Sequence, residues 1–180
     1  MEDKLIKRVA REDRHAFNEF YQLTHKRVYR YLYRILRDEQ MAEDVLIETY
    51  TEVWRSARRF RGDSQVLTWV IGIARNLAMN LARKKKINEL DIDSVHNQLV
   101  VQAHCVEESE RAELIARAID LISANHREVL DLVFFQEFTY KEISQLIGIP
   151  VNTVKTRVFY AKEELRNTLK DMGIEKDDIL

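Results

Sequence analysis

The polar residues that follow a glycine–proline corner near the C-terminus are the side chains of this sequence best suited to specific chemistry. The corner lies in EISQLIGIPVNTVKTRVFYAKEEL, which runs from Glu142 to Leu165 and contains the only proline of the chain. Amide, hydroxyl and basic groups come directly after it, and such groups bind base edges and phosphates. They are Asn152, Thr153, Lys155, Thr156, Arg157, Lys162 and Arg166. The pattern indicates nucleic-acid recognition rather than a reaction.

The corner predicts a helix-turn-helix motif. Thr139 and Glu142 form a capping-box pattern for a short first helix, which Gly148 can end in the left-handed conformation. Pro150 or Val151 then opens a second helix, whose buried face is predicted from its spacing. That face comprises Val154, Val158, Ala161 and Leu165. The start of the second helix would meet base edges and its later basic residues would meet phosphates. A plain helical hairpin with a solvated basic face is the alternative.

Enzyme chemistry finds no support in the sequence. We find no glycine-rich phosphate loop, no H-E-x-x-H pair and no nucleophile elbow. His104 and Cys105 are adjacent, but no further residues have the spacing of a zinc site. We therefore predict that the protein is not an enzyme and that it holds no metal and no cofactor.

Composition predicts an all-α protein. The chain has 180 residues, with 4 glycines, 1 proline and 46% hydrophobic residues, which disfavours sheet and excludes wholesale disorder. A single cysteine excludes an internal disulfide framework. No apolar run is long enough to span a membrane, and the charged N-terminus does not resemble a signal peptide. We therefore expect a cytoplasmic protein without membrane insertion.

Charge divides the chain into parts. Residues 1–86 hold 19 Lys and Arg against 12 Asp and Glu, whereas residues 87–124 hold 2 against 8. A basic first half followed by an acidic middle indicates a polyanion-binding unit and a separate connector. Chance asymmetry on a solvated surface is the alternative.

Helical spacing predicts three helices in the first half. The first covers 13–36, the second is capped by Asp38, and the third begins after the RFRGDS loop and ends in the basic run RKKK. The second helix carries two apolar stripes, and the one formed by Ile47, Tyr50 and Trp54 is either additional core or a partner's surface.

Periodicity fades after Lys86 and resumes near Leu114. We therefore predict two small helical domains, 1–86 and 108–180, joined by a flexible linker at 87–107. Asn125 and Glu128 predict a second capping box in the C-terminal domain.

Two long stretches resemble one protein family. DEQMAEDVLIETYTEVWRSARRFRGDSQVLTWVIGIARNLAMNLARKKK resembles region two of bacterial sigma factors of the extracytoplasmic-function (ECF) group, within the sigma-70 superfamily. YKEISQLIGIPVNTVKTRVFYAKEELRN resembles region four of the same group. The resemblance covers about 10–86 and 108–170, in the family's order. It implies a transcription initiation factor that binds core RNA polymerase, recognises the −35 and −10 promoter elements and promotes DNA melting.

The resemblance also implies site residues. In the family, the loop before the third helix captures a flipped base of the single-stranded −10 element, while region four reads the duplex −35 element. For the −10 element the matching residues are Phe60, Arg61, Gly62, Asp63, Ser64, Arg75, Asn76, Arg83, Lys84 and Lys85. Trp69 matches a mainly structural tryptophan. For the −35 element they are Pro150, Val151, Asn152, Thr153, Lys155, Thr156, Arg157 and Lys162.

Partners follow from the same resemblance. The second helix of the family binds a coiled coil of the polymerase's largest subunit. The matching surface here is Asp44, Glu48, Glu52, Val53 and Trp54. Family members are commonly held inactive by an anti-sigma factor, so the resemblance implies one for this chain, although none of its residues shows it.

Two other classes remain open. A helix-turn-helix regulator would bind duplex operators without being a polymerase subunit, and a helical adaptor would bind protein alone. The aromatic and basic first half and the lack of a sensor domain argue against the regulator. Promoter-specific transcription by core polymerase supplied with this protein separates the three.

Overall fold

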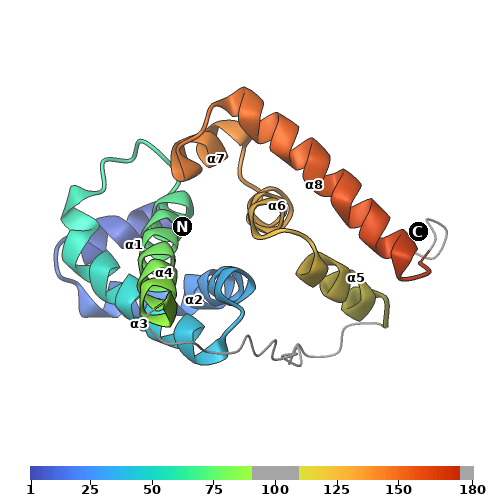
Figure 1. The fold of residues 1–180 in the computed structure, drawn as a ribbon. Coiled ribbons are helices and arrows are strands. Elements are labelled where there is room, and N and C mark those ends of the chain that lie inside the picture. The colour runs from blue at the N-terminus through green and yellow to red at the C-terminus, as the bar shows by residue number, and fades with distance from the viewer. Residues whose placement is uncertain (91–109, 175–180) are drawn as a thin grey trace. The chain divides into compact units, whose positions relative to one another are not determined.

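The computed structural model describes residues 1–90 and 110–174, and every regular element in these two ranges is helical. The chain divides into two compact units, Met1–Leu99 and Val100–Leu180 (Figure 1). The predicted all-α fold with two small helical domains is confirmed. The predicted domain boundaries stay predictions, and most of the predicted linker lies outside the described residues.

The first unit is a small bundle. It consists of α1 (Glu2–Val9), α2 (Arg14–Leu36), α3 (Glu39–Ser56), a 3₁₀ turn η1 (Ala57–Arg59) and α4 (Val66–Leu90). The helix α2 packs against α1, α3 and α4, and α3 packs against α4. Apolar residues at three- and four-residue spacing put one stripe of each helix into this core. Its most buried members include Phe20, Tyr31, Leu32, Val45, Val53 and Ile71.

Local signals set the helix ends of this unit. The Asp13 carboxylate accepts a hydrogen bond from the Ala16 N–H at 3.0 Å, and Asp38 accepts one from the Met41 N–H at 2.9 Å. Both N-caps satisfy backbone donors that have no partner inside the helix. The predicted starts of α2 and α3 are therefore confirmed. The helix α1 was not predicted, and α4 runs four residues past Lys86, where the first domain was predicted to end.

The second apolar stripe of α3 is divided between core and surface. Tyr50 is buried, and its hydroxyl lies 2.6 Å from the Thr24 hydroxyl, which donates to the Phe20 carbonyl. Burial raises the pKa of Tyr50 well above its usual range. Trp54 is half-buried and packs edge-on against Phe17, with ring centroids 5.1 Å apart. These contacts attach α3 to α2.

The second unit is built around one long helix. Its elements are α5 (Glu110–Leu121), α6 (Ala124–Leu130), a π-helical segment (Asp131–Phe135), α7 (Tyr140–Ile147) and α8 (Val151–Asp171). The helix α8 packs against α5, α6 and α7. The shared core includes Ile122, Val129, Leu132, Ile143, Val154, Val158 and Ala161.

The predicted capping box at Asn125 is wrong. The helix α6 begins at Ala124 after Ser123, and no side chain of its own caps it. Glu164 of α8 supplies the carboxylate instead, because it accepts hydrogen bonds from the Ser123 N–H at 3.1 Å and the Ser123 hydroxyl at 3.2 Å. Glu128, the proposed partner in the box, is buried. A hydrogen bond from a distant helix therefore takes the place of the predicted local one between Asn125 and Glu128.

Candidate nucleic-acid interfaces

A short loop joins η1 to α4 in the first unit. Phe60 leaves the 3₁₀ turn in an extended conformation, and Gly62 follows with φ +78°. A Cβ at Gly62 would meet no atom within 4 Å, so the backbone conformation rather than space favours glycine there. The helix α4 then begins, and its Trp69 N–H donates to the Gln65 carbonyl at 3.1 Å.

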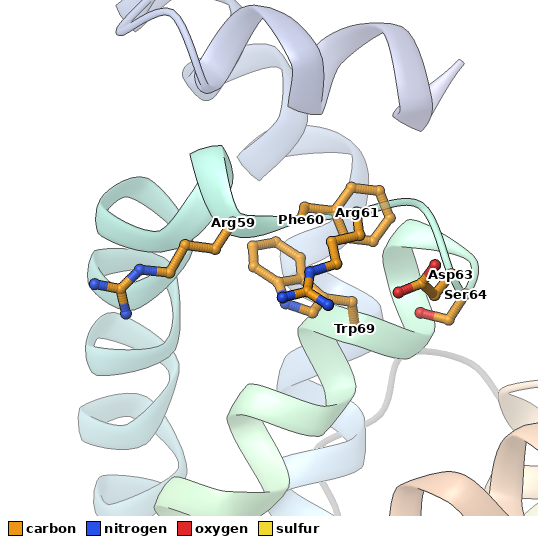
Figure 2. Close-up of a pocket in the computed structure, with 6 residues that line it drawn as sticks. All are labelled: Arg59, Phe60, Arg61, Asp63, Ser64 and Trp69. Carbon is orange, nitrogen blue, oxygen red and sulfur yellow. The ribbon is translucent and has the colours of Figure 1, made fainter.

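This loop borders an open cavity of about 290 Å³ (Figure 2). Its side chains are Arg59, Phe60, Arg61, Asp63, Ser64 and Trp69. The rings of Phe60 and Trp69 lie side by side, with centroids 5.2 Å apart and planes at 47°. Aromatic rings offer stacking to any base, guanidinium groups offer donors and phosphate contacts, and a carboxylate and a hydroxyl can read a base edge. The arrangement is suited to one unstacked nucleobase.

The structure brings together some of the residues assigned to the −10 element. Phe60, Arg61, Asp63 and Ser64 line the cavity, and Gly62 lies in the same loop. Two further lining residues, Arg59 and Trp69, were missed as contacts. Arg59 could have been identified because it directly precedes Phe60. Trp69 was noted in the sequence but was given a mainly structural role.

The remaining −10 residues lie farther along α4. Asn76 follows Trp69 by seven residues, which places it on the same face about 10 Å along the helix axis, outside the cavity. Its side chain is exposed, and that of Arg75 is half-buried and engaged in a contact. Arg83 and Lys84 are exposed near the end of α4, while the side chain of Lys85 lies outside the described residues.

The corner between α7 and α8 has the predicted construction. The Thr139 hydroxyl accepts from the Glu142 N–H at 3.3 Å, and the Glu142 carboxylate accepts from the Thr139 N–H at 2.9 Å. Gly148 ends α7 with φ +71°. The Ser144 hydroxyl donates to the Ile149 carbonyl at 2.6 Å, which fixes the corner from inside. The predicted capping box and left-handed glycine are confirmed.

The helix α8 presents a polar and basic face. Val154, Val158 and Ala161 are buried, so the opposite side of the helix faces solvent. The exposed residues assigned to the −35 element are Pro150, Asn152, Thr153, Lys155, Thr156 and Lys162, and the half-buried ones are Val151 and Arg157. Lys162 lies over the Phe134 ring, with 5.1 Å from its Nζ to the ring centroid.

Two aromatic residues continue this exposed face. Phe159 and Tyr160 pack edge to face, with ring centroids 5.5 Å apart, and both are exposed. Sequence analysis missed them, although they follow Thr156 by three and four residues and therefore share its side of the helix.

The residues assigned to core polymerase all lie on α3. Asp44 and Glu48 are exposed on α3, and Glu52 and Trp54 are half-buried. Val53 is fully buried in the first unit, so its side chain offers nothing to a partner. Ile47 is 66% exposed on the same helix, between Asp44 and Glu48 along the chain. It joins the acids that sequence analysis identified.

Residues suited to other chemistry do not gather in the described parts of the chain. Among the side chains that the structure describes, those of residues 1–84 and 114–174, we find no group of three or more histidine, cysteine and acidic residues that could hold a metal ion. No helix within residues 1–90 and 110–174 is long and apolar enough to cross a membrane. His104 and Cys105 lie outside the described residues.

Two family models match parts of the chain. The family model for Sigma-70 region 2 matches residues 20–87, and the model for Sigma-70, region 4 matches residues 112–165. Together they cover about two thirds of the chain, and the first contains the cavity loop while the second contains the α7–α8 corner.

Whole-length relatives are also found. The chain is 29% identical over 176 residues to the ECF RNA polymerase sigma factor SigK of Mycobacterium tuberculosis, covering 93% of this chain and 92% of that protein. It is 29% identical over 181 residues to the ECF RNA polymerase sigma factor SigW of Bacillus subtilis, covering 94% and 97%.

Solved structures share the fold. The sigma factor RpoE from Bartonella quintana, in complex with the anti-sigma factor NepR, matches with a TM-score of 0.77 and 24% identity, over 86% of this chain and 96% of that chain. CnrH, in complex with the cytosolic domain of CnrY, matches with a TM-score of 0.68 and 18% identity, over 93% and 96%. With regions two and four matched in order along one chain, this protein belongs to the sigma-70 family of RNA polymerase sigma factors, in its ECF group.

Proposed function

We propose that this chain directs core RNA polymerase to two-element promoters, and that its two units read DNA in different states. The observation that carries the proposal is the presence, in one chain, of an aromatic-lined cavity and of an exposed polar helix start. The cavity beside Phe60 and Trp69 suits a single flipped base, whereas the exposed start of α8 suits the major groove of a duplex. A regulator that binds only duplex operators has no use for the first site.

The −10 element would be held by the cavity and by α4. One base of the non-template strand would leave the stack and enter between the aromatic rings and the polar loop residues. Asn76 would contact the neighbouring nucleotide, and Arg83, Lys84 and Lys85 would hold phosphates downstream. Capture of an unstacked base stabilises the open form of the promoter, so binding and melting are coupled.

The −35 element would be read by α8. Asn152, Thr153 and Thr156 lie near its start, where base edges are within reach, and Lys155, Arg157 and Lys162 supply positive charge for phosphates. The corner at Gly148 sets the direction in which α8 leaves α7. The two elements together fix the start site and the orientation of the polymerase.

Core polymerase would bind the exposed acidic face of α3. Asp44, Glu48 and Ile47 are the accessible centre of this surface, with Glu52 and Trp54 at its half-buried edge. The polymerase supplies the catalysis and this chain none, and the protein would act in the cytoplasm where polymerase and chromosome meet. Because the structural relative RpoE was solved with the anti-sigma factor NepR, we also propose an anti-sigma factor for this chain.

One experiment tests the proposal. Sigma-free bacterial core polymerase is mixed with the protein and with a library of duplexes randomised over the promoter region, and transcripts are sequenced. We expect transcripts from templates that share two motifs about two helical turns apart. A protein that binds the library without yielding such transcripts would be a duplex regulator, and one that binds no DNA would be an adaptor.

A further inference from the structure

The helix α1 packs against both segments that flank the cavity loop. It contacts η1, which leads into the loop, and α4, which leaves it. Leu5, Ile6 and Val9 anchor α1 in the core of the first unit. The helix precedes residues 20–87, which the family model for region 2 matches.

One arginine connects α1 to the loop. Arg58 lies in η1, directly before the cavity residues Arg59 and Phe60. Its Nε donates to the Ala10 carbonyl at 3.0 Å, and its guanidinium also donates to the Glu12 carboxylate at 2.8 Å. Two bonds from one planar group fix its orientation as well as its position.

The turn that receives Arg58 is itself held in place. Glu12 has φ +65°, and its N–H donates to the Val9 carbonyl at 2.8 Å, which closes the turn after α1. Arg8 of α1 donates to the Asp13 carboxylate at 2.9 Å, and Asp13 caps α2. These hydrogen bonds connect the start of α2 to the turn after α1, and the turn to η1.

We infer that Arg58 is a positioning residue for base capture. Its contacts with the turn Ala10–Glu12 hold the start of the cavity loop in place. The inference rests on the proposed capture of a flipped base. Arg58 and Glu12 are 67% and 69% exposed, so their ion pair contributes little to folding stability. A site for one base depends on small displacements of its walls, so the loss of this pair acts on the cavity rather than on the fold.

The experiment measures how much the captured base contributes to binding. Holoenzyme is titrated with single-stranded non-template oligonucleotides from a promoter selected as above, each with one abasic site in the −10 element. In the wild type, the abasic site at the captured position should weaken binding about 5- to 150-fold, the range of one stacked base. Arg58→Ala and Glu12→Gln should each reduce this abasic penalty about 2- to 10-fold, with affinity for core polymerase and melting temperature unchanged.

Matched variants distinguish a positioning role of Arg58 from a direct effect of its positive charge on DNA binding. Arg55→Ala removes an exposed positive charge one turn earlier and should leave the abasic penalty as in the wild type. The charge exchange Arg58→Glu with Glu12→Arg should restore part of the penalty. If Arg58→Ala weakened intact and abasic strands equally while Glu12→Gln changed nothing, Arg58 would be a phosphate contact and the inference would be overturned. A wild type with no abasic penalty at any position would instead overturn base capture itself.

Discussion

At the scale of single residues, Glu164 is a carboxylate with a long-range structural role. It accepts hydrogen bonds from His126 and from Ser123, and so joins α8 to the start of α6. Burial raises the pKa of Glu164, but these hydrogen bonds outweigh burial and lower the pKa below its usual value. A carboxylate with a lowered folded pKa stabilises the folded state above its unfolded pKa of about 4.3, and this stability is lost as pH falls through the folded pKa.

We therefore expect Glu164→Gln to destabilise the second unit near pH 7, by about 1 kcal/mol because the side chain is 37% exposed and partly screened. The loss should shrink as pH falls below about 5. Protection of α6 and α8 from amide hydrogen exchange, measured over a pH series, reports it. Glu163→Gln is the control, since the partner of Glu163 in the described part of the chain is Arg166 on its own helix. Equal effects of the two variants would contradict this role of Glu164.

Asn76 offers a second prediction at this scale. It lies on the cavity side of α4 but outside the cavity, so we expect it to contact the strand next to the captured base. Asn76→Ala should weaken open-complex formation by about 1–3 kcal/mol and leave binding to core polymerase intact. Permanganate reactivity of unpaired thymines measures melting. Unchanged melting would remove Asn76 from the DNA-binding surface.

At the scale of elements, the orientation of α8 predicts two kinds of variant. Asn152, Thr153 and Thr156 are exposed near its start, so Asn152→Ala should change which −35 sequence is preferred, by about 1–3 kcal/mol. Lys155→Gln should weaken all sequences similarly and lower the slope of binding against salt by about 1. Duplex binding at several salt concentrations measures both. If Lys155→Gln changed the preference and Asn152→Ala did not, α8 would lie in the groove differently from our proposal.

At the scale of the whole molecule, the predicted linker must let two units reach two promoter elements. Elements two helical turns apart are separated by about 70 Å. The nineteen residues between the end of α4 and the start of α5 could span at most about 63–68 Å if fully extended. Deleting about ten residues between 91 and 106 should therefore abolish transcription from two-element promoters, while the shortened protein still binds core polymerase. Run-off transcription and a core-binding assay measure the two properties, and full activity of the shortened protein would refute a spanning linker.

Much of this protein could be predicted from sequence because the relevant signals are local. Asp13 and Asp38 cap helices through donors three residues away, the Thr139–Glu142 box is complete within four residues, and Gly148 takes its conformation because it lacks a Cβ. The order of the loop and the helix-turn-helix corner along the chain is likewise given by the sequence. Composition predicted the all-α class, and local signals of this kind predicted the loop at RFRGDS and the helix-turn-helix corner.

Tertiary structure decided the features that depend on which helices pack together, namely side-chain burial and long-range hydrogen bonds. Val53 and Ile47 are both apolar residues of α3, yet one is fully buried and the other 66% exposed, because only one side of the helix packs in the bundle. Asn125 had the spacing of a cap, but Glu164 provides the carboxylate from 41 residues beyond Ser123. Arg58 reaches a carbonyl 48 residues earlier in the chain. Such pairings depend on the packing of distant segments, which the local pattern of residues does not specify.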